Sequence, residues 1–407
     1  MTKKYTEELE RGYTMLTVME EAQRCLLCHD APCSAACPAQ TDPAKFIRSV
    51  RFRNFKGAAE TVRVHNALGA VCARVCPTER YCESGCSRSG IDRPIHIGKI
   101  QRFVTDFEAQ CGMTILEKGA AKGKHVAVIG GGPAGLQAAA SLLTLGYDVT
   151  IFEKDVQAGG FLRGGIPEYR LPDRVVDAEI ERIVKLGAQL RCGVQVGKDI
   201  SMDELRQKYD AVLIAVGIGK ANMLPMFEGN PYAVPAVTFL REVDEKRGAL
   251  SLPDNALVIG GGDAAMDVSA TLKLLGVTNV TNVTRKELSD FRALRAELET
   301  ARDAGVTIID GYAPVAAEGK TVTFRHRKLN SELRIEADLI VLAVGQSTTA
   351  DALGLKTEKN EVPFDGYQVE GKVFVTGDLA RGDKTVVWAV KKAKEAAAAI
   401  DAYLEGR

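Results

Sequence analysis

The sequence lacks both a long apolar run and an excess of charge of either sign. No stretch of its 407 residues approaches the length of a membrane-spanning helix, and the first eight residues have no apolar segment like that of a signal peptide. Lysine and arginine together number 53, as do aspartate and glutamate, so the net charge gives no reason to expect nucleic acid or a membrane as a partner. We therefore expect a soluble, cytoplasmic protein of about two to four domains.

Two further absences narrow the chemistry. The five histidines form no pattern from which a Ser-His-Asp triad could be argued. No pair of cysteines follows either of the two glycine-rich turns described below, which excludes a redox-active dithiol and leaves Cys111 and Cys192 as structural residues. We predict that no side chain acts as a general acid, general base or nucleophile.

What the sequence has instead is a dense group of cysteines. Eight of the ten lie between positions 25 and 86, and a reducing compartment favours metal or redox chemistry over disulfides. They form two runs, Cys25-x2-Cys28-x4-Cys33-x3-Cys37-Pro38 and Cys72-x3-Cys76-Pro77-x4-Cys82-x3-Cys86. Cysteine followed by proline is typical of bacterial iron–sulfur sites, so we predict two [4Fe–4S] clusters, with structural zinc and disulfides as alternatives. Spacing does not pair the cysteines, because the two runs can interleave.

Between the two runs, apolar residues recur at helical spacing over residues 46–62, which predicts a helical stretch. Its basic residues are most simply interpreted as a solvated face, with a docking surface as the alternative. They are Lys45, Arg48, Arg51, Arg53 and Lys56. His29, inside the first run, is interpreted as a loop residue rather than a metal ligand.

A dinucleotide-binding βαβ unit follows the cysteine region. Residues 126–129 have the pattern of a buried strand that breaks into glycines, and the next strand ends on Glu153. Gly130 would make the tight turn, Gly132 would let the backbone approach a pyrophosphate, and Gly135 would let helix and strand pack closely. Glu153 would accept hydrogen bonds from ribose hydroxyls. We predict FAD as the ligand, because a flavin accepts a hydride from one side and gives single electrons to the other.

The same pattern recurs at residues 256–265, where a strand is followed by a G-x-G-x-x-A fingerprint that begins at Gly260. A second nucleotide is therefore predicted. The strand over residues 279–284 does not end on an acid. It ends on Arg285 and Lys286, with Arg292 further on. Basic residues suit a 2′-phosphate, so the sequence favours NADPH over NADH; the alternative is a surface charge cluster offset by Glu287.

These patterns predict an α/β protein in which a helical two-cluster iron–sulfur domain precedes two Rossmann-like nucleotide-binding domains. We expect an iron–sulfur domain at 1–115, a discontinuous FAD domain at 120–221 and 346–407, and an inserted NAD(P) domain at 222–345. Strands at 212–217 and 339–345 have matching glycine ends and are interpreted as paired returns to the FAD domain. A glycine-rich loop at 159–172 and a Gly-Asp turn at 377–378 would complete the flavin site, and the amino-terminus of the last helix would face the flavin.

The motifs resemble one known family closely. Residues 24–38, 54–60, 71–79 and 382–387 are similar to the electron-input subunit of bacterial NAD-dependent dihydropyrimidine dehydrogenase. The same order of modules resembles the amino-terminal half of the animal enzyme and the small subunit of glutamate synthase. The resemblance covers essentially the whole chain, and its cysteine and Gly-Asp motifs are specific.

The resemblance implies cluster ligands that spacing does not assign. One [4Fe–4S] cluster would be held by Cys25, Cys28, Cys33 and Cys86. The other would be held by Cys37, Cys76, Cys82 and the side chain of Gln101, which leaves Cys72 as a spare thiol.

The resemblance and the two fingerprints together give the expected nucleotide contacts. The residues expected to contact FAD are Gly130, Gly132, Pro133, Ala134, Gly135, Glu153, Lys154, Gly160, Arg170, Val196, Gly377, Asp378, Thr385 and Val386. Those expected to contact the nicotinamide dinucleotide are Gly260, Gly262, Asp263, Ala264, Arg285, Lys286, Arg292 and Gly345. The basic residues match the NADPH-using animal enzyme, whereas the bacterial subunit is named for NAD.

The implied function is electron input. NAD(P)H would deliver a hydride to FAD, and the electrons would pass through two clusters to a partner subunit that holds FMN and further clusters. That partner would reduce uracil or thymine to the 5,6-dihydropyrimidine in a heteromer, expected to be a heterotetramer, because the three modules leave no room here for a pyrimidine site. The alternatives are a glutamate synthase small subunit with a different partner, and a non-catalytic redox sensor or assembly scaffold.

Overall fold

A computed structural model describes residues 5–291 and 293–407, and the chain divides into two compact units. The larger unit holds residues 10–160, 173–218 and 348–407. The smaller unit holds the described residues up to Leu9, residues 161–172 and residues 219–347. Arg292, one of the predicted nucleotide-binding residues, lies outside the described residues.

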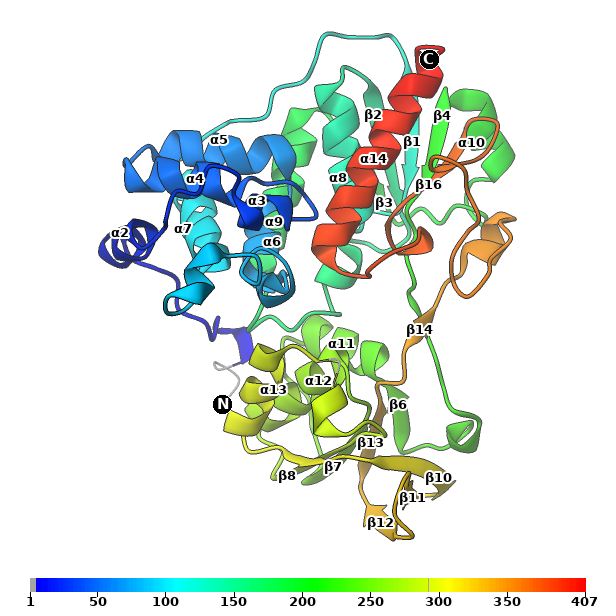
Figure 1. Ribbon diagram of the computed structural model, residues 1–407. Helices are drawn as coiled ribbons and strands as arrows, with labels where there is room; N and C mark the ends of the chain where they lie inside the picture. The colour runs from blue at the N-terminus through cyan, green and yellow to red at the C-terminus, as the bar shows by residue number, and fades with distance from the viewer. Residues whose placement is uncertain (1–4, 292) are drawn as a thin grey trace. The chain divides into compact units, whose positions relative to one another are not determined.

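The larger unit begins with a group of helices (Figure 1, blue to cyan). They are α2 (Met15–Gln23), α3 (Pro32–Ala35), α4 (Pro43–Arg51), α5 (Phe55–His65), α6 (Gly69–Val75) and α7 (Ile97–Gln110). Phe46 of α4, Val62 of α5 and Ile100 of α7 are buried in their common core. The helical stretch expected over 46–62 is two helices, because Arg53 has a φ of +57° and Asn54 accepts the N–H of Gly57 as a new helix cap.

A six-stranded sheet forms the second part of the larger unit, in the order β15-β16-β4-β1-β2-β3, and only β15 runs antiparallel to its neighbour. Its strands are β1 (His125–Ile129), β2 (Asp148–Glu153), β3 (Gln189–Cys192), β4 (Ala211–Ile214), β15 (Gln368–Glu370) and β16 (Val373–Val375). Its helices are α8 (Pro133–Thr144), α9 (Asp173–Leu186), α10 (Met202–Lys208) and α14 (Val386–Leu404). The central strands β1 and β4 are buried on both faces, which explains their continuous apolar sequences. Helix α14 packs along α8 (Figure 1).

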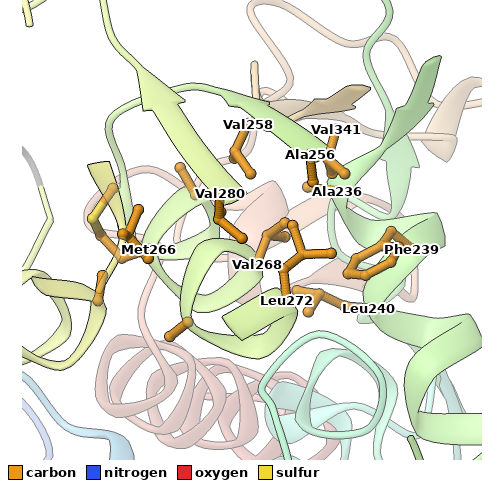
Figure 2. Close-up of a cluster of buried hydrophobic side chains, with 14 of the residues drawn as sticks. Ala236, Phe239, Leu240, Ala256, Val258, Met266, Val268, Leu272, Val280 and Val341 are labelled. Carbon is orange, nitrogen blue, oxygen red and sulfur yellow. The ribbon is translucent and has the colours of Figure 1, made fainter. Parts of the chain in front are cut away.

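The smaller unit has a parallel five-stranded sheet in the order β6-β13-β7-β8-β9. Its strands are β6 (Ala233–Pro235), β7 (Asn255–Ile259), β8 (Asn279–Val283), β9 (Thr307–Ile309) and β13 (Leu339–Leu342), and its helices are α11 (Ala236–Glu245), α12 (Asp263–Leu274) and α13 (Arg295–Asp303). An antiparallel sheet of β10 (Tyr312–Glu318), β11 (Thr321–His326) and β12 (Glu332–Glu336) and a pair of β5 (Lys220–Ala221) with β14 (Gln346–Ser347) complete it. Figure 2 shows its core, where Val258 and Val341 of the sheet face Val268 and Leu272 of α12.

Short 3₁₀ turns connect the elements of both units. They lie at Thr78–Arg80, Ser87–Gly90, Gly160–Leu162, Pro225–Phe227, Leu288–Asp290, Ala350–Leu353 and Gly377–Leu379. No helix in the described ranges, 5–291 and 293–407, is long and apolar enough to cross a membrane.

The predicted α/β class with two Rossmann-like sheets is confirmed. The interpretation of residues 339–345 as a return to the FAD domain is wrong. Strand β13 pairs with β6 and β7, in the register Ile340 to Ala233 and Ile340 to Leu257, so it is a central strand of the smaller unit. The chain re-enters the larger unit only at Thr348.

A buried network of charges joins the helical group to the sheet region within the larger unit. Arg63 of α5 is 2% exposed and donates hydrogen bonds to Glu108 of α7 at 2.8 Å and to Glu179 of α9 at 2.6 Å. Glu179 also accepts the N–H of Ala70, and Glu108 accepts from Arg182 at 2.7 Å. Because a buried charge is costly without its partner, this network holds the two parts of the unit in a fixed arrangement.

We expect Arg63→Met to destabilise the larger unit by about 3–5 kcal/mol, because it leaves two buried carboxylates without their shared cation. The matched control is Lys56→Met on the same helix, which removes an exposed ion pair of 3.7 Å with Glu60 and should cost less than about 1 kcal/mol. Urea unfolding followed by circular dichroism measures both. Equal unfolding midpoints for the two variants would contradict a stabilising role for the network.

Candidate cofactor sites

Four half-buried cysteines line one small cavity at the helical end of the larger unit. These residues, the outer cysteine group, are Cys25, Cys28, Cys33 and Cys86. Burial, together with the nearby Cys86 and Cys25, raises the pKa of the Cys33 thiol to about 11. The structure therefore brings the last cysteine of the second run together with the first three of the first run.

The other four cysteines of the two runs form a second, more buried set. These residues, the inner cysteine group, are Cys37, Cys72, Cys76 and Cys82. Burial raises the pKa of Cys76 well above its ordinary value, and Cys72, Cys82 and Cys37 add to this effect. Burial also raises the pKa of Cys72 to about 12. The two runs thus interleave, as spacing allowed.

Gln101 of α7 is buried, and its amide nitrogen donates to the carbonyl oxygen of Gly69 at 2.8 Å. That bond uses the nitrogen and leaves the amide oxygen as the atom available to a metal. Cys72 is 3% exposed and belongs to the inner cysteine group. A metal centre at the inner site could therefore be held by Cys37, Cys76 and Cys82, with either Cys72 or Gln101 as its fourth ligand.

The cysteine groups fit a cluster better than a single ion. Raised thiol pKa values mean that a metal centre must displace the protons on binding, as soft thiolate sites do. Within the described part of the chain, no three Cys, His, Asp or Glu side chains lie close enough to share one metal ion, which a zinc site would require. A cluster of several irons would not require its thiolate ligands to converge on one atom.

The turn after β1 has the geometry of a nucleotide fingerprint. Gly130 has a φ of +107°, and a Cβ there would lie 2.6 Å from the carbonyl oxygen of Ala215. A Cβ on Gly135 would lie 1.9 Å from the oxygen of Gly130, so α8 can approach β1 only without a side chain there. At Gly132 the nearest atom to a Cβ would be the Cα of Gly160, at 3.9 Å. The amino-terminus of α8 is therefore open to a pyrophosphate.

Glu153 lies at the end of β2 and is 5% exposed. Its carboxylate accepts the N–H groups of Gly131 at 2.6 Å and of Asp155 at 2.9 Å. These bonds hold the carboxylate beside the fingerprint turn, where a nucleotide ribose would be expected. The next residue, Lys154, is exposed, and the side chain of Val196 is buried in the core below.

The Gly-Asp turn after β16 meets the first turn of α8. Gly377 has a φ of +71°, and a Cβ there would lie 2.8 Å from the Cβ of Ala134. Burial raises the pKa of Asp378 at the same turn. The hydroxyl of Thr376 is buried without a hydrogen-bond partner among residues 5–291 and 293–407, as expected where a ligand completes a site. Pro133 and Ala134 begin α8, and Thr385 directly precedes α14, which begins at Val386, without a capping hydrogen bond between its side chain and any described backbone N–H.

A buried lysine holds this turn in place. Lys392 of α14 is 1% exposed, and its ammonium donates to the carbonyl oxygens of Gly377, Ala380 and Asp383 at 3.2, 2.9 and 3.1 Å. All three of its N–H donors are satisfied. The loop between the Gly-Asp turn and α14 is therefore fixed by the helix that follows it.

Two contacts join the inner cysteine group to this flavin-side loop. Tyr81, in the loop that carries the second cysteine run, donates its phenol hydrogen to Asp383 at 2.8 Å. Burial raises the pKa of Tyr81 to about 12, so the phenol remains a donor. Lys394 of α14 donates to the carbonyl oxygen of Ala39, which closely follows Cys37, at 2.8 Å. The inner cysteine group thus lies against the flavin side of the unit, and the outer cysteine group is the more exposed.

The roles of Tyr81, Asp383, Lys392 and Lys394 could not be predicted from the sequence. The partners in these two contacts are 302 and 355 residues apart in the chain, so no local pattern could pair them. The one available signal was an aromatic residue placed inside a cysteine run.

The smaller unit repeats the fingerprint geometry at the end of β7. Gly260 has a φ of +150°, and a Cβ there would lie 2.4 Å from the oxygen of Ala343. A Cβ on Gly262 would meet no atom within 4 Å, so the amino-terminus of α12 is open. Asp263 begins α12, just before Ala264, and accepts the N–H of Leu294 at 2.7 Å. Because β7, β8 and β13 are parallel, the turns that follow them, including that of Gly345, share one edge of the sheet.

The basic residues after β8 remain available to a ligand. Arg285 is exposed and Lys286 is half-buried, and neither forms an ion pair within the described ranges. Glu287 pairs instead with Lys328, at 2.5 Å. The alternative that Glu287 offsets the two cations therefore receives no support from the geometry.

Arg170 lies in the smaller unit, apart from the other residues expected to contact FAD. Its guanidinium bonds both carboxylate oxygens of Asp267 at 2.7 Å and also pairs with Glu297. The structure thus assigns this side chain two partners on α12 and α13. Its contact with FAD stays a prediction.

Comparison with known proteins matches both parts of the chain. Residues 2–113 match the family described as dihydropyrimidine dehydrogenase domain II, 4Fe-4S cluster, and residues 124–397 match the pyridine nucleotide-disulphide oxidoreductase family. The chain is 55% identical to the NAD-dependent dihydropyrimidine dehydrogenase subunit PreT of Escherichia coli K12, over 99% of this chain and 98% of that one. It is 30% identical to the glutamate synthase [NADPH] small chain of Halomonas elongata, over 98% and 93%. The resemblance found in the sequence is confirmed, as is the prediction of 4Fe–4S chemistry, whereas the number of clusters stays a prediction; structural zinc is not supported.

A solved structure shows the same fold. FprA of Mycobacterium tuberculosis in complex with NADPH has a TM-score of 0.60 and 19% identity, covering 70% of this chain and 85% of that one. At that identity the likeness concerns the arrangement of helices and sheets alone.

Two glycines of the first fingerprint give a matched test, because a Cβ has room at Gly132 and none at Gly135. Gly135→Ala should destabilise the larger unit by about 1–3 kcal/mol, because its methyl group would overlap the oxygen of Gly130. Gly132→Ala should fold with unchanged stability but lose most of its flavin, because only the ligand approaches that position. Flavin content and urea unfolding of the flavin-free proteins measure both. Full flavin retention in Gly132→Ala would show that the pyrophosphate lies elsewhere.

Proposed function

The chain belongs to the family of NAD-dependent dihydropyrimidine dehydrogenase subunits, and we propose that it feeds electrons from NAD(P)H to a partner subunit that reduces uracil or thymine. It is a flavin and iron–sulfur oxidoreductase that uses FAD, NAD(P)H and 4Fe–4S chemistry. When bound, the flavin exchanges a hydride for two single electrons, which iron–sulfur centres can carry one at a time.

One observation carries the proposal. The loop before α14 and α14 itself bind both segments of the inner cysteine group, through Tyr81 with Asp383 and Lys394 with Ala39. Electron transfer falls steeply with distance, so direct contact between the flavin-side loop and the cysteine loops is what an internal relay requires. A scaffold without electron transfer would not need this contact.

The order of the relay follows from exposure. The inner cysteine group is mostly buried and touches the flavin side, whereas all four members of the outer cysteine group are half-exposed. Electrons would therefore pass from the flavin to the inner site, then to the outer site, and leave the chain there. The partner subunit would dock near the outer cysteine group.

We assign two [4Fe–4S] clusters to the two groups. The outer cluster would be held by Cys25, Cys28, Cys33 and Cys86. The inner cluster would be held by Cys37, Cys76, Cys82 and Gln101, and the bond from Gln101 to Gly69 supports this choice by directing the amide oxygen away from that carbonyl. Cys72 would remain a protonated thiol beside the inner cluster.

The nicotinamide dinucleotide would bind the smaller unit at the edge formed by Gly260, Gly262, Arg285, Lys286 and Gly345. Arg285 and Lys286 have no ion-pair partner within residues 5–291 and 293–407, which supports a 2′-phosphate there. The PreT relative is described as NAD-dependent and the glutamate synthase relative as using NADPH. We therefore propose that both nucleotides are accepted, with NADPH favoured.

The partner would hold FMN and further clusters, in a cytoplasmic heterotetramer. Identity of 55% to a dihydropyrimidine dehydrogenase subunit, against 30% to a glutamate synthase small chain, favours the pyrimidine-reducing partner. We propose domain limits of 1–115 for iron–sulfur, 120–221 with 346–407 for FAD, and 222–345 for NAD(P). The compact units put the two junctions a few residues away, at 218–219 and 347–348, and also assign residues 161–172 to the smaller unit.

The direct test is anaerobic titration of the purified chain with NADH and with NADPH. We expect about eight irons and one FAD per chain, as two four-iron clusters require, with bleaching of the flavin by either nucleotide. Four irons per chain would contradict the second cluster. A flavin that neither nucleotide reduces would refute electron input and leave a scaffold.

Nucleotide preference has its own matched control. Arg285→Ser should raise the apparent KM for NADPH on the order of tenfold and leave that for NADH unchanged, because only the phosphate contact is lost. Lys328→Ser, which removes the partner of Glu287, should change neither value. An equal effect of Arg285→Ser on both nucleotides would contradict a 2′-phosphate contact.

A further inference from the structure

Lys394 places a positive charge beside the inner cysteine group. It lies on α14, more than two turns after the helix begins at the flavin side, and its side chain is half-buried. Its ammonium donates to the carbonyl oxygen of Ala39 at 2.8 Å, and it interacts electrostatically with the thiol of Cys37. The helix that caps the flavin site therefore also delivers a cation to the inner metal site.

The charge of Lys394 is not explained by an ion pair. Within residues 5–291 and 293–407 no carboxylate lies within salt-bridge distance of its ammonium, whereas Lys391, on the same helix, pairs with Glu395. Burial lowers the pKa of Lys394, whereas Cys37 and, to a smaller extent, the carboxylate of Glu395 oppose that effect. Because Glu395 is already paired with Lys391, a half-buried cation at Lys394 is costly unless a further negative group compensates it. A thiolate-ligated cluster is such a group.

We propose that Lys394 raises the reduction potential of the inner cluster, and so favours transfer of each electron from the reduced flavin to that cluster. The inference rests on the proposed function, which puts a cluster in the inner cysteine group. A cluster held by the inner cysteine group would accept one electron from the reduced flavin, so its net charge would become more negative by one while no bond is made or broken. The ammonium that bonds the carbonyl oxygen of Ala39, two residues after Cys37, would stabilise the added negative charge, so the reduced state would gain more than the oxidised state.

Other charged groups lie near Lys394 and also contribute to the electrostatic potential at the inner site. The imidazole of His65 interacts electrostatically with Lys394, Asp42 and Lys45. Asp42 is itself engaged, since its carboxylate accepts from the Ser34 hydroxyl at 2.7 Å. Lys394 differs from His65 and Lys45 in bonding the backbone of the loop that carries Cys37. Its charge is therefore the one with a fixed position relative to the inner site.

The test is an EPR-monitored redox titration of the full chain and its variants. Lys394→Gln removes the charge but keeps an amide that can donate to Ala39, and Lys394→Arg keeps the charge. Lys391→Gln removes a half-buried charge from the same helix, one that pairs with Glu395 and, within the described residues, makes no hydrogen bond to the Cys37 loop, and serves as the control. We expect Lys394→Gln to lower the equilibrium constant for electron transfer from flavin to inner cluster by roughly tenfold, about 59 mV for a one-electron couple.

Lys394→Arg and Lys391→Gln should keep the midpoint potential of the natural protein. A role in tethering the loop alone would lower stability but leave the potential unmoved. An unchanged potential in Lys394→Gln, or an equal shift in Lys391→Gln, would overturn the proposal.

Each protein is reconstituted anaerobically with iron and sulfide, and the potential is determined from occupied clusters only. Should Lys394→Gln take up no inner cluster, Lys394→Met removes the same charge with an unbranched side chain only one heavy atom shorter. If the natural protein binds one cluster and shows a single cluster signal, the proposed two-cluster function is refuted. If it binds two clusters and NAD(P)H bleaches its flavin, but the potential of the inner cluster does not change in Lys394→Gln, only the proposal for Lys394 is refuted.

Discussion

The rest of the structure depends on the buried contact of Arg63 with Glu108 and Glu179. It joins a helix of the cysteine region, a second helix of that region and α9 of the flavin region in one compact unit. Burying three charged groups at an internal boundary is costly, and apolar residues would hold the same surfaces together at no greater expense. The network also fixes the orientation of the helices relative to one another, because a bidentate guanidinium constrains the angle between its partners as well as their distance. A relay of single electrons requires that constraint, since its centres must stay at set distances.

The two nucleotide sites follow one physical rule. At both Gly130 and Gly260 the backbone has a positive φ, and a Cβ would collide with a carbonyl oxygen of the neighbouring strand, at 2.6 and 2.4 Å. At both Gly132 and Gly262 the space beyond the glycine is open. The same turn thus produces an exposed helix amino-terminus twice. The sites differ in what ends the next strand, which is a buried carboxylate in one and a pair of cations in the other.

Local chemistry could be predicted from the sequence, and long-range contacts could not. The fingerprint turns and the class of the fold depend on residues close together in the chain, so the prediction of the two sheets was correct. Strand β13 was assigned to the wrong sheet because an apolar run that ends in glycine has the same appearance in either one. The helix break at Arg53 was not predicted, because the positive φ of Arg53 has no signature in the sequence and Asn54 acts as a helix cap only after that turn. Tyr81, Lys392 and Lys394 have no local motif, and their roles depend on partners brought near by folding.

The central claim is that one chain contains the whole path from nucleotide to outer cluster. The most direct measurement mixes the purified chain, without any partner, with NADPH under anaerobic conditions, and follows flavin absorbance and cluster EPR signals in time. We expect the flavin to be reduced first and cluster signals then to appear in the isolated chain. Clusters that stay oxidised while the flavin is fully reduced would contradict it, as would clusters that are reduced equally fast in flavin-free protein.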